Sequence, residues 1–205
     1  MAKRSFRRPP PNRNLRKVYV IATEGKCTEP LYFQCFQGNP YRQNLSIKLL
    51  PARKGQSAPK SVLKRLQEYA KKSGLKPQDE LWLVIDVPEW TTADLQAVYQ
   101  ACQKEGYSLA ASNPSFELWL LLHQENPRTP STVSECEREL TRLLGKPYDK
   151  SNYDPHRLLP KVDHAIAHAQ RLHTDDAEPW PPSVGTQVYK LVAHLIASPT
   201  PATSP

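Results

Sequence analysis

The sequence has no cysteine pair at metal-binding spacing, no secretory leader and no long apolar run. Its four cysteines form no CxxC motif, which argues against a zinc ribbon or a disulfide framework; they are Cys27, Cys35, Cys102 and Cys136. No apolar stretch approaches the roughly 20 residues that a membrane span needs. We therefore expect a soluble, cytoplasmic protein with reduced thiols and no membrane partner.

Several catalytic signatures are also absent. The sequence contains no P-loop, no glycine-rich dinucleotide fingerprint and no hydrolase triad. A self-sufficient ATPase or a small-molecule enzyme is therefore not expected. No internal repeat is visible, and 205 residues are enough for one domain, alone or with a small helical extension. We favour the second arrangement.

Positive charge is concentrated at the start of the chain. Residues 1–17 contain seven Lys and Arg and no acid, out of a net charge of +8, so the rest of the chain is close to neutral. We predict a disordered basic arm over residues 1–15, in which Arg7 and Arg8 are candidates for contacts with nucleic-acid phosphates. A solubilising terminus is the alternative. The polar end of the chain is predicted to be a disordered tail over residues 199–205.

Strand-like and helix-like segments alternate over residues 16–125. Apolar runs predict four strands, at residues 16–23, 45–52, 80–87 and 107–111. The segments between them have apolar residues at helical spacing, and Thr28 is a candidate N-cap for the first helix, over residues 29–37. Strands that alternate with helices favour right-handed crossovers. We therefore predict an α/β domain whose four-stranded, mainly parallel sheet is flanked by helices.

The pattern changes after residue 125. Three helices are predicted and no further strand; they cover residues 131–144, 154–172 and 184–197, each with apolar residues three and four positions apart. Residues 126–198 are therefore expected to form a C-terminal helical extension.

Acidic residues follow three of the apolar runs. Glu24 ends the first strand, Asp86 ends the third, and Glu117 lies just after the fourth. In an open α/β sheet the carboxyl ends of parallel strands share one edge, where ligands bind, so these carboxylates are expected to converge. A carboxylate cluster indicates a divalent cation or raised pKa values. Each residue alone also has an ordinary interpretation, as a solvated turn acid or as a helix-start acid favoured by the helix dipole.

Three sequence motifs resemble the RloB-like proteins. They are EGKCTEPLYF at 24–33, LWLVIDVPEW at 81–90 and SNPSFELWLLLH at 112–123. The resemblance implies a TOPRIM-like domain in a bacterial anti-phage defence system, often with an ATPase partner of the AAA or ABC type. It further implies that Glu24 acts in acid/base or metal chemistry and that Asp86 holds Mg²⁺ or Mn²⁺. Glu117 would complete the metal shell, with Glu29 and Glu89 as secondary candidates.

The third-strand motif departs from the family pattern at one position. The pattern expects Asp-Val-Asp-Glu-Trp, whereas this chain has Pro88 in place of the second aspartate. A missing carboxylate weakens metal binding unless Glu89 or Glu117 substitutes. Two functions therefore stay open: a metal-dependent nuclease, and a degenerate TOPRIM domain that binds nucleic acid or an ATPase without cutting.

Basic residues after the second strand are candidates for phosphate binding. Arg53, Lys54 and Lys60 lie near the predicted ligand edge, followed by Lys64 and Arg65. A solvated helix face is the alternative. The sequence leaves open whether the target is DNA, RNA or tRNA, and whether the chain forms a homo-oligomer.

Overall fold

The computed structural model describes residues 17–37, 45–53, 55–173, 175 and 177–197. The predicted arm and tail, with Arg7, Arg8 and Lys54, lie outside the described residues. The described strands are β1 (Lys17–Thr23), β2 (Leu45–Leu50), β3 (Glu80–Asp86), β4 (Ser108–Asn113) and β5 (Gly185–Thr186). They form one sheet in the order β2-β1-β3-β4-β5, with parallel pairing from β2 to β4. The predicted α/β fold with a mainly parallel sheet is confirmed.

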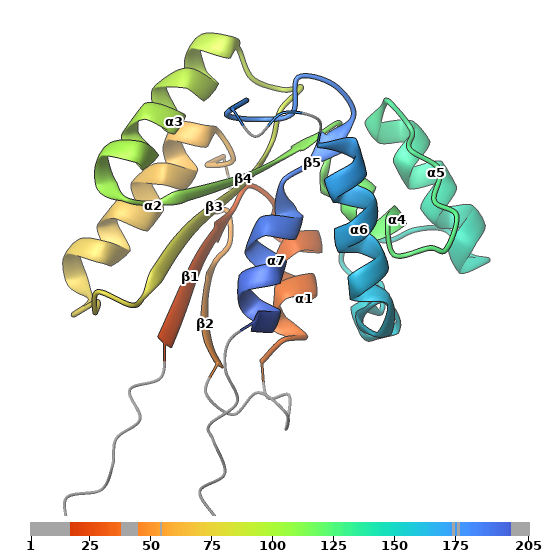
Figure 1. Cartoon of the computed structure of the whole chain (residues 1–205), viewed down its shortest axis with the longest axis horizontal. Coiled ribbons are helices and arrows are strands. Elements are labelled where there is room, and N and C mark those ends of the chain that lie inside the picture. Colours follow the sequence, from red (N-terminus) through yellow and green to blue (C-terminus); the bar gives the residue numbers. More distant parts are fainter. Residues whose placement is uncertain (1–16, 38–44, 54, 174, 176, 198–205) are drawn as a thin grey trace, which may run out of the picture.

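Two layers of helix enclose this sheet. The α-helices are α1 (Thr28–Gln34), α2 (Pro59–Lys72), α3 (Thr92–Glu105), α4 (Phe116–Leu121), α5 (Val133–Leu144), α6 (Val162–Leu172) and α7 (Val188–Ala197). Two short 3₁₀ helices, η2 (Pro155–Arg157) and η3 (Leu159–Lys161), precede α6. Helices α2 and α3 cover one face of the sheet, and α1 and α7 lie on the other (Figure 1).

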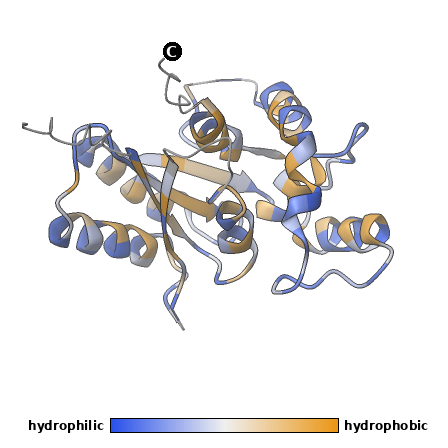
Figure 2. Ribbon diagram, turned by 90° about the horizontal axis from the view of Figure 1, so that it is seen from below, coloured by the Kyte–Doolittle hydropathy of each residue, from blue (hydrophilic) through white to orange (hydrophobic). Residues whose placement is uncertain are grey.

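Alternate residues of each strand supply the two cores. Val20 and Leu83 pack with α2 and α3, whereas Ile21 and Val84 pack with the helices of the opposite face. This alternation is the period of two expected for strands covered on both sides. Figure 2 shows apolar residues in the central strands and on the helix sides that face them.

The C-terminal helices share a core with the sheet. Cys136 of α5, Ala165 of α6 and Leu191 of α7 are buried in the same apolar cluster as Ile21 and Val84. The segment after residue 125 therefore packs directly on the α/β layers. No helix in the described ranges has the length and apolar character needed to cross a bilayer.

The structure corrects three details of the predicted elements. The sheet has a fifth strand, because Gly185 and Thr186 pair antiparallel with Asn113 and Ser112 before α7 begins. Two residues are too few to produce a strand pattern in the sequence.

The helix predicted over residues 154–172 is α-helical only from Val162. Pro155 and Pro160 lack the N–H groups that an α-helix needs, so two 3₁₀ turns take this place. The third correction concerns α1, where Cys27 is the N-cap residue and Thr28 is the first helical residue.

Candidate functional site

The carboxyl ends of β1, β3 and β4 lie side by side, and an acidic residue lies at or shortly after each of these strand ends. Glu24 is the first residue after β1, and its N–H donates to the Val84 carbonyl of β3 at 2.9 Å. Asp86 ends β3 opposite Ser112 of β4. Glu117 lies in the first turn of α4, directly after β4. The structure brings Glu24, Asp86 and Glu117 to one pocket of about 300 Å³.

A fourth carboxylate, Glu29 in the first turn of α1, lines the same pocket. Its side chain is buried and accepts the Gly25 N–H at 2.8 Å. Glu24, Glu29, Asp86 and Glu117 are called the carboxylate pocket below. Glu89 does not line it: this residue is exposed in the turn after β3.

Glu24 is held by donors from the end of β3 and from the turn that follows. Its carboxylate accepts the Asp86 N–H at 3.0 Å and the Trp90 indole N–H at 3.1 Å. Only 8% of the residue is exposed. Burial raises the pKa of Glu24 from 4.5 to about 7, against the lowering effect of the two hydrogen bonds, and the charges of Glu89 and Glu29 raise it further. Glu24 can therefore exchange a proton near neutral pH.

The carboxylates of Asp86 and Glu29 are also poorly stabilised as anions. Burial raises the pKa of Asp86 well above its ordinary value, and the charges of Glu29, Glu24 and Glu117 add to the effect. Burial likewise raises the pKa of Glu29, and the charge of Glu117 contributes. When ionised, the four carboxylates outnumber the two lysines that line the pocket, and a bound cation would relieve the excess negative charge.

The loop after α5 supplies polar groups at the mouth of the carboxylate pocket. Tyr148 donates its hydroxyl to Glu117 Oε1 at 3.3 Å, and Lys150 Nζ lies 3.5 Å from the same oxygen. Lys150 also pairs with Glu137 of α5 at 2.9 Å. Tyr153 anchors the loop through a 2.7 Å hydrogen bond to the Thr28 carbonyl. Residues assigned from sequence to a helical extension therefore take part in the site.

The chemistry of the pocket fits a hard divalent cation, although no ligand shell is preassembled. Carboxylate oxygens are the side-chain ligands that Mg²⁺ prefers, and one or two of them are enough when waters and substrate phosphates complete the shell. Among the residues that the structure describes, no group of three or more His, Cys, Asp or Glu is placed to hold a metal ion. Asp86 with a neighbouring carboxylate is the set that fits such an ion.

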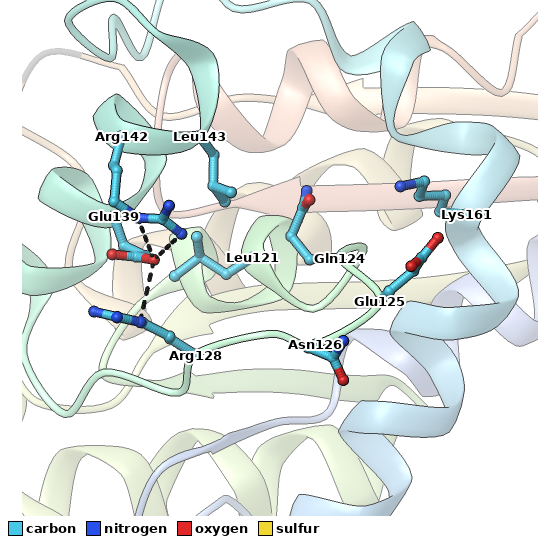
Figure 3. A pocket seen from close by; sticks show the side chains of 9 residues that line it. All are labelled: Leu121, Gln124, Glu125, Asn126, Arg128, Glu139, Arg142, Leu143 and Lys161. Carbon is cyan, nitrogen blue, oxygen red and sulfur yellow. Dashed lines mark hydrogen bonds and ion pairs between the residues drawn. The ribbon is translucent and has the colours of Figure 1, made fainter.

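A second pocket, of about 280 Å³, shows the opposite balance of charge (Figure 3). It lies between the end of α4, α5 and Lys161. Glu139 Oε1 accepts two hydrogen bonds from Arg142, at 2.6 and 2.9 Å, and Arg128 Nε lies 3.6 Å away. These partners lower the pKa of Glu139. Its carboxylate is therefore neutralised within the protein, unlike the carboxylates of Glu24 and Asp86.

Comparison with known proteins identifies the family. A family model described as RloB-like protein matches residues 19–195, which include the carboxylate pocket and all of the sheet and C-terminal helices except the first two residues of β1 and the last two of α7. The chain belongs to the RloB-like family. The resemblance seen in the three sequence motifs is thereby confirmed. Searches of the curated proteins and of the solved structures gave no match.

The described basic residues that follow β2 in this RloB-like protein lie in different surroundings. Lys60 is exposed and pairs with Asp94 of α3 at 2.7 Å. Arg53 and Arg65 both line a pocket of about 400 Å³ between β2 and α2. Arg65 points into the protein, where its guanidinium donates to the Thr23 carbonyl at 2.7 Å and to the Gln56 carbonyl at 2.6 Å. Arg65 therefore braces the end of β1, beside Glu24.

This bracing role predicts a loss of stability when Arg65 is replaced. Arg65→Met leaves the buried Thr23 carbonyl and the Gln56 carbonyl without their donor, so we expect the free energy of unfolding to fall by about 2 kcal/mol or more. Urea denaturation measures the change. Lys64→Met is the matched control, because Lys64 is exposed on the same helix; its effect should stay within about 0.5 kcal/mol. Equal effects of the two variants would contradict the bracing role.

Sequence analysis missed three groups that contact the predicted site residues. Trp90 lies in the third-strand motif but was not among the predicted site residues, and its indole N–H binds Glu24. Tyr148 and Lys150 lie in an irregular loop, and no spacing in the sequence links them to Glu117. A lysine and a tyrosine in a loop are ordinary surface residues by pattern, and only the packing of the loop against α1 and α4 brings them to the pocket.

Proposed function

We propose that this RloB-like protein hydrolyses phosphodiester bonds of nucleic acid at the carboxylate pocket, with Mg²⁺ or Mn²⁺ as the cofactor. The observation that carries the proposal is the group of four carboxylates at the carboxyl edge of a parallel sheet, with raised pKa values at Glu24, Glu29 and Asp86. Perturbed carboxylates in a pocket at this edge are typical of functional sites. Structural ion pairs, as at Glu139, lower carboxylate pKa values instead.

The roles follow from the position of each carboxylate. Glu24 is held in place by two donors and has a pKa near 7, so it serves as the general base that accepts a proton from the attacking water. Asp86 and Glu117 would hold the metal, with Glu89 as an outer candidate reachable from its exposed turn. When bound, the metal supplies positive charge that polarises the phosphate and lowers the pKa of water.

The family resemblance extends the proposal to a cellular context. We place the protein in the bacterial cytoplasm, as the TOPRIM-type component of an anti-phage defence system with an AAA- or ABC-type ATPase as its partner. Arg53, Lys54 and Lys60 after β2, together with Arg7 and Arg8 of the arm, would bind nucleic-acid backbone. Assembly as a homo-oligomer belongs to the same proposal.

A second function is favoured by two observations. Pro88 supplies no carboxylate two residues after Asp86, and no three-ligand group is assembled among the described residues. Both features suit a degenerate domain that binds nucleic acid or the ATPase partner without cutting. Metal binding separates the two functions, because an adaptor needs no metal.

Replacement of Asp86 tests the proposal directly. We expect Mn²⁺ to bind the native protein and its affinity to fall by at least about 100-fold in Asp86→Ala, since even groups one shell away from a metal contribute about 10- to 100-fold. Calorimetric titration with Mn²⁺ measures the affinity. Asp163→Ala, which removes an exposed carboxylate on α6, is the control and should bind as the native protein does. Absence of Mn²⁺ binding in the native protein would favour the adaptor.

A further inference from the structure

Lys150 is the cation that the fold places against the carboxylate pocket from the C-terminal segment. The loop that carries it is fixed on both sides, through Tyr153 on the Thr28 carbonyl and through Tyr148 on Glu117. Nζ lies 3.5 Å from Glu117 and 2.9 Å from Glu137. These contacts therefore hold the ammonium group of Lys150 at the mouth of the pocket.

The same ammonium group is open to a ligand. About half of the Lys150 side chain is exposed, whereas Glu117 beneath it is 4% exposed. An ammonium group has three N–H donors, and among the described residues two carboxylates are its partners. One donor remains for an oxygen that approaches the mouth of the pocket.

A phosphate is the oxygen ligand that suits this position. The four carboxylates of the pocket repel a polyanion, so a nucleic acid needs positive charge at the point where it approaches them. A compact ammonium group binds phosphate as a point charge. Glu117 and Glu137 hold Lys150 at the rim, where it can meet a backbone phosphate without filling the pocket.

We propose that Lys150 binds a backbone phosphate of nucleic acid at the mouth of the carboxylate pocket. The inference rests on the proposed function in one respect, namely that this phosphate is the one whose bond is cleaved. The phosphate contact itself holds equally for a protein that binds nucleic acid without cleaving it. The proposal also gives the loop after α5 a function, because this loop brings a cation from the C-terminal segment to the edge of the sheet.

Binding in the absence of metal tests the contact. We expect Lys150→Gln to weaken binding of a fluorescein-labelled single strand, DNA or RNA, by about tenfold in EDTA and to reduce the slope of log affinity against log salt by about 1. Lys150→Arg should bind within about threefold of the native protein, because it keeps the charge. Lys146→Gln is the matched control: it removes the same charge from the same loop, at an exposed residue that does not line the pocket. Fluorescence anisotropy measures all four proteins.

Cleavage and Mn²⁺ binding of the same proteins separate this inference from the proposed function. If the contact is made to the scissile phosphate, Lys150→Gln should cut about 100-fold more slowly while still binding Mn²⁺. Weaker binding of Lys150→Gln alone, with no cleavage by any protein, supports the phosphate contact and overturns the nuclease. Equal binding by Lys150→Gln and Lys146→Gln overturns the contact, whether or not the native protein cuts. A native protein that binds neither strand overturns it as well.

Discussion

The Glu24→Gln variant is expected to lose cleavage activity and, without metal, to be more stable than the native protein above pH 7. A positioned general base contributes about 100- to 10,000-fold to rate, so cleavage should fall by that factor. Glutamine keeps an acceptor oxygen for the Asp86 and Trp90 donors but cannot accept the proton. The native rate should rise as the pH increases through about 7, where Glu24 becomes ionised.

The gain in stability follows from the direction of the pKa shift. The folded protein raises the pKa of Glu24 from 4.5 to about 7, so it binds a proton more tightly than the unfolded chain does. The contribution of protonated Glu24 to stability is present below pH 4.5 and is lost as the pH rises through 7. Glutamine does not ionise, so the variant does not lose this contribution to stability as the pH rises. Above pH 7 the variant should therefore be more stable, by up to about 3 kcal/mol.

Urea denaturation at about pH 5 and about pH 8 measures the difference, and initial rates on plasmid, single-stranded DNA and tRNA give the cleavage. Glu68→Gln, which neutralises an exposed carboxylate on α2, should change neither the free energy of unfolding nor the cleavage rate. Trp90→Phe provides a second check, because losing this donor raises the pKa of Glu24 and moves the rise in rate to higher pH. Native-like cleavage by Glu24→Gln would remove Glu24 from the reaction, and a stability difference independent of pH would contradict its buried charge.

The parts of the fold that follow from short-range pattern were predictable. The buried run that ends at Asp86 and the strand that ends before Glu24 have strong apolar patterns, and alternation with helices then requires parallel pairing. The cap at Thr91 and the left-handed Gly106 at the end of α3 are local signals of the same kind. Parallel pairing is what carries Glu24 and Asp86 to the same edge.

Features that depend on contacts between distant segments were not predictable. Lys150 reaches Glu117 only because its loop packs across α1, and Arg65 turns inward only because the Thr23 carbonyl needs a donor. Glu29 has the pattern of an ordinary helix-start acid, and its membership in the pocket depends on how α1 leaves β1. Sequence patterns encode which face of an element is apolar, but they do not encode which loop covers which edge.

The Gly25→Ala variant is expected to displace the Glu29 carboxylate and so disturb the carboxylate pocket. A Cβ at this position would lie 2.1 Å from Glu29 Oε2 and 2.7 Å from its Cδ. The backbone of Gly25 is not left-handed, so alanine adds no backbone strain there, and the clash opposes only the small gain from a less flexible unfolded chain. The carboxylate must leave the Gly25 N–H, and we expect the free energy of unfolding to fall by about 1–3 kcal/mol.

A double-mutant cycle isolates the clash. In a Glu29→Ala background the space beside Gly25 is open, so Gly25→Ala should cost less than about 0.5 kcal/mol or stabilise slightly, because alanine restricts the unfolded chain. Gly74→Ala is the matched control, since a Cβ there meets nothing within 4 Å. Urea denaturation of the five proteins measures the coupling. Additive effects of the two substitutions would show that the carboxylate does not occupy the position described.

The cleavage rates of the same proteins then decide what Glu29 contributes. Its charge raises the pKa of Asp86, so moving the Glu29 carboxylate changes the field at the residue proposed to hold the metal. If Glu29 belongs to the reacting group, Gly25→Ala should cut at least about tenfold more slowly under conditions where it is fully folded, and Glu29→Ala should not restore the rate. If the rate returns in the double variant together with stability, Glu29 only braces the turn after β1. The position of one glycine therefore separates a catalytic carboxylate from a structural one.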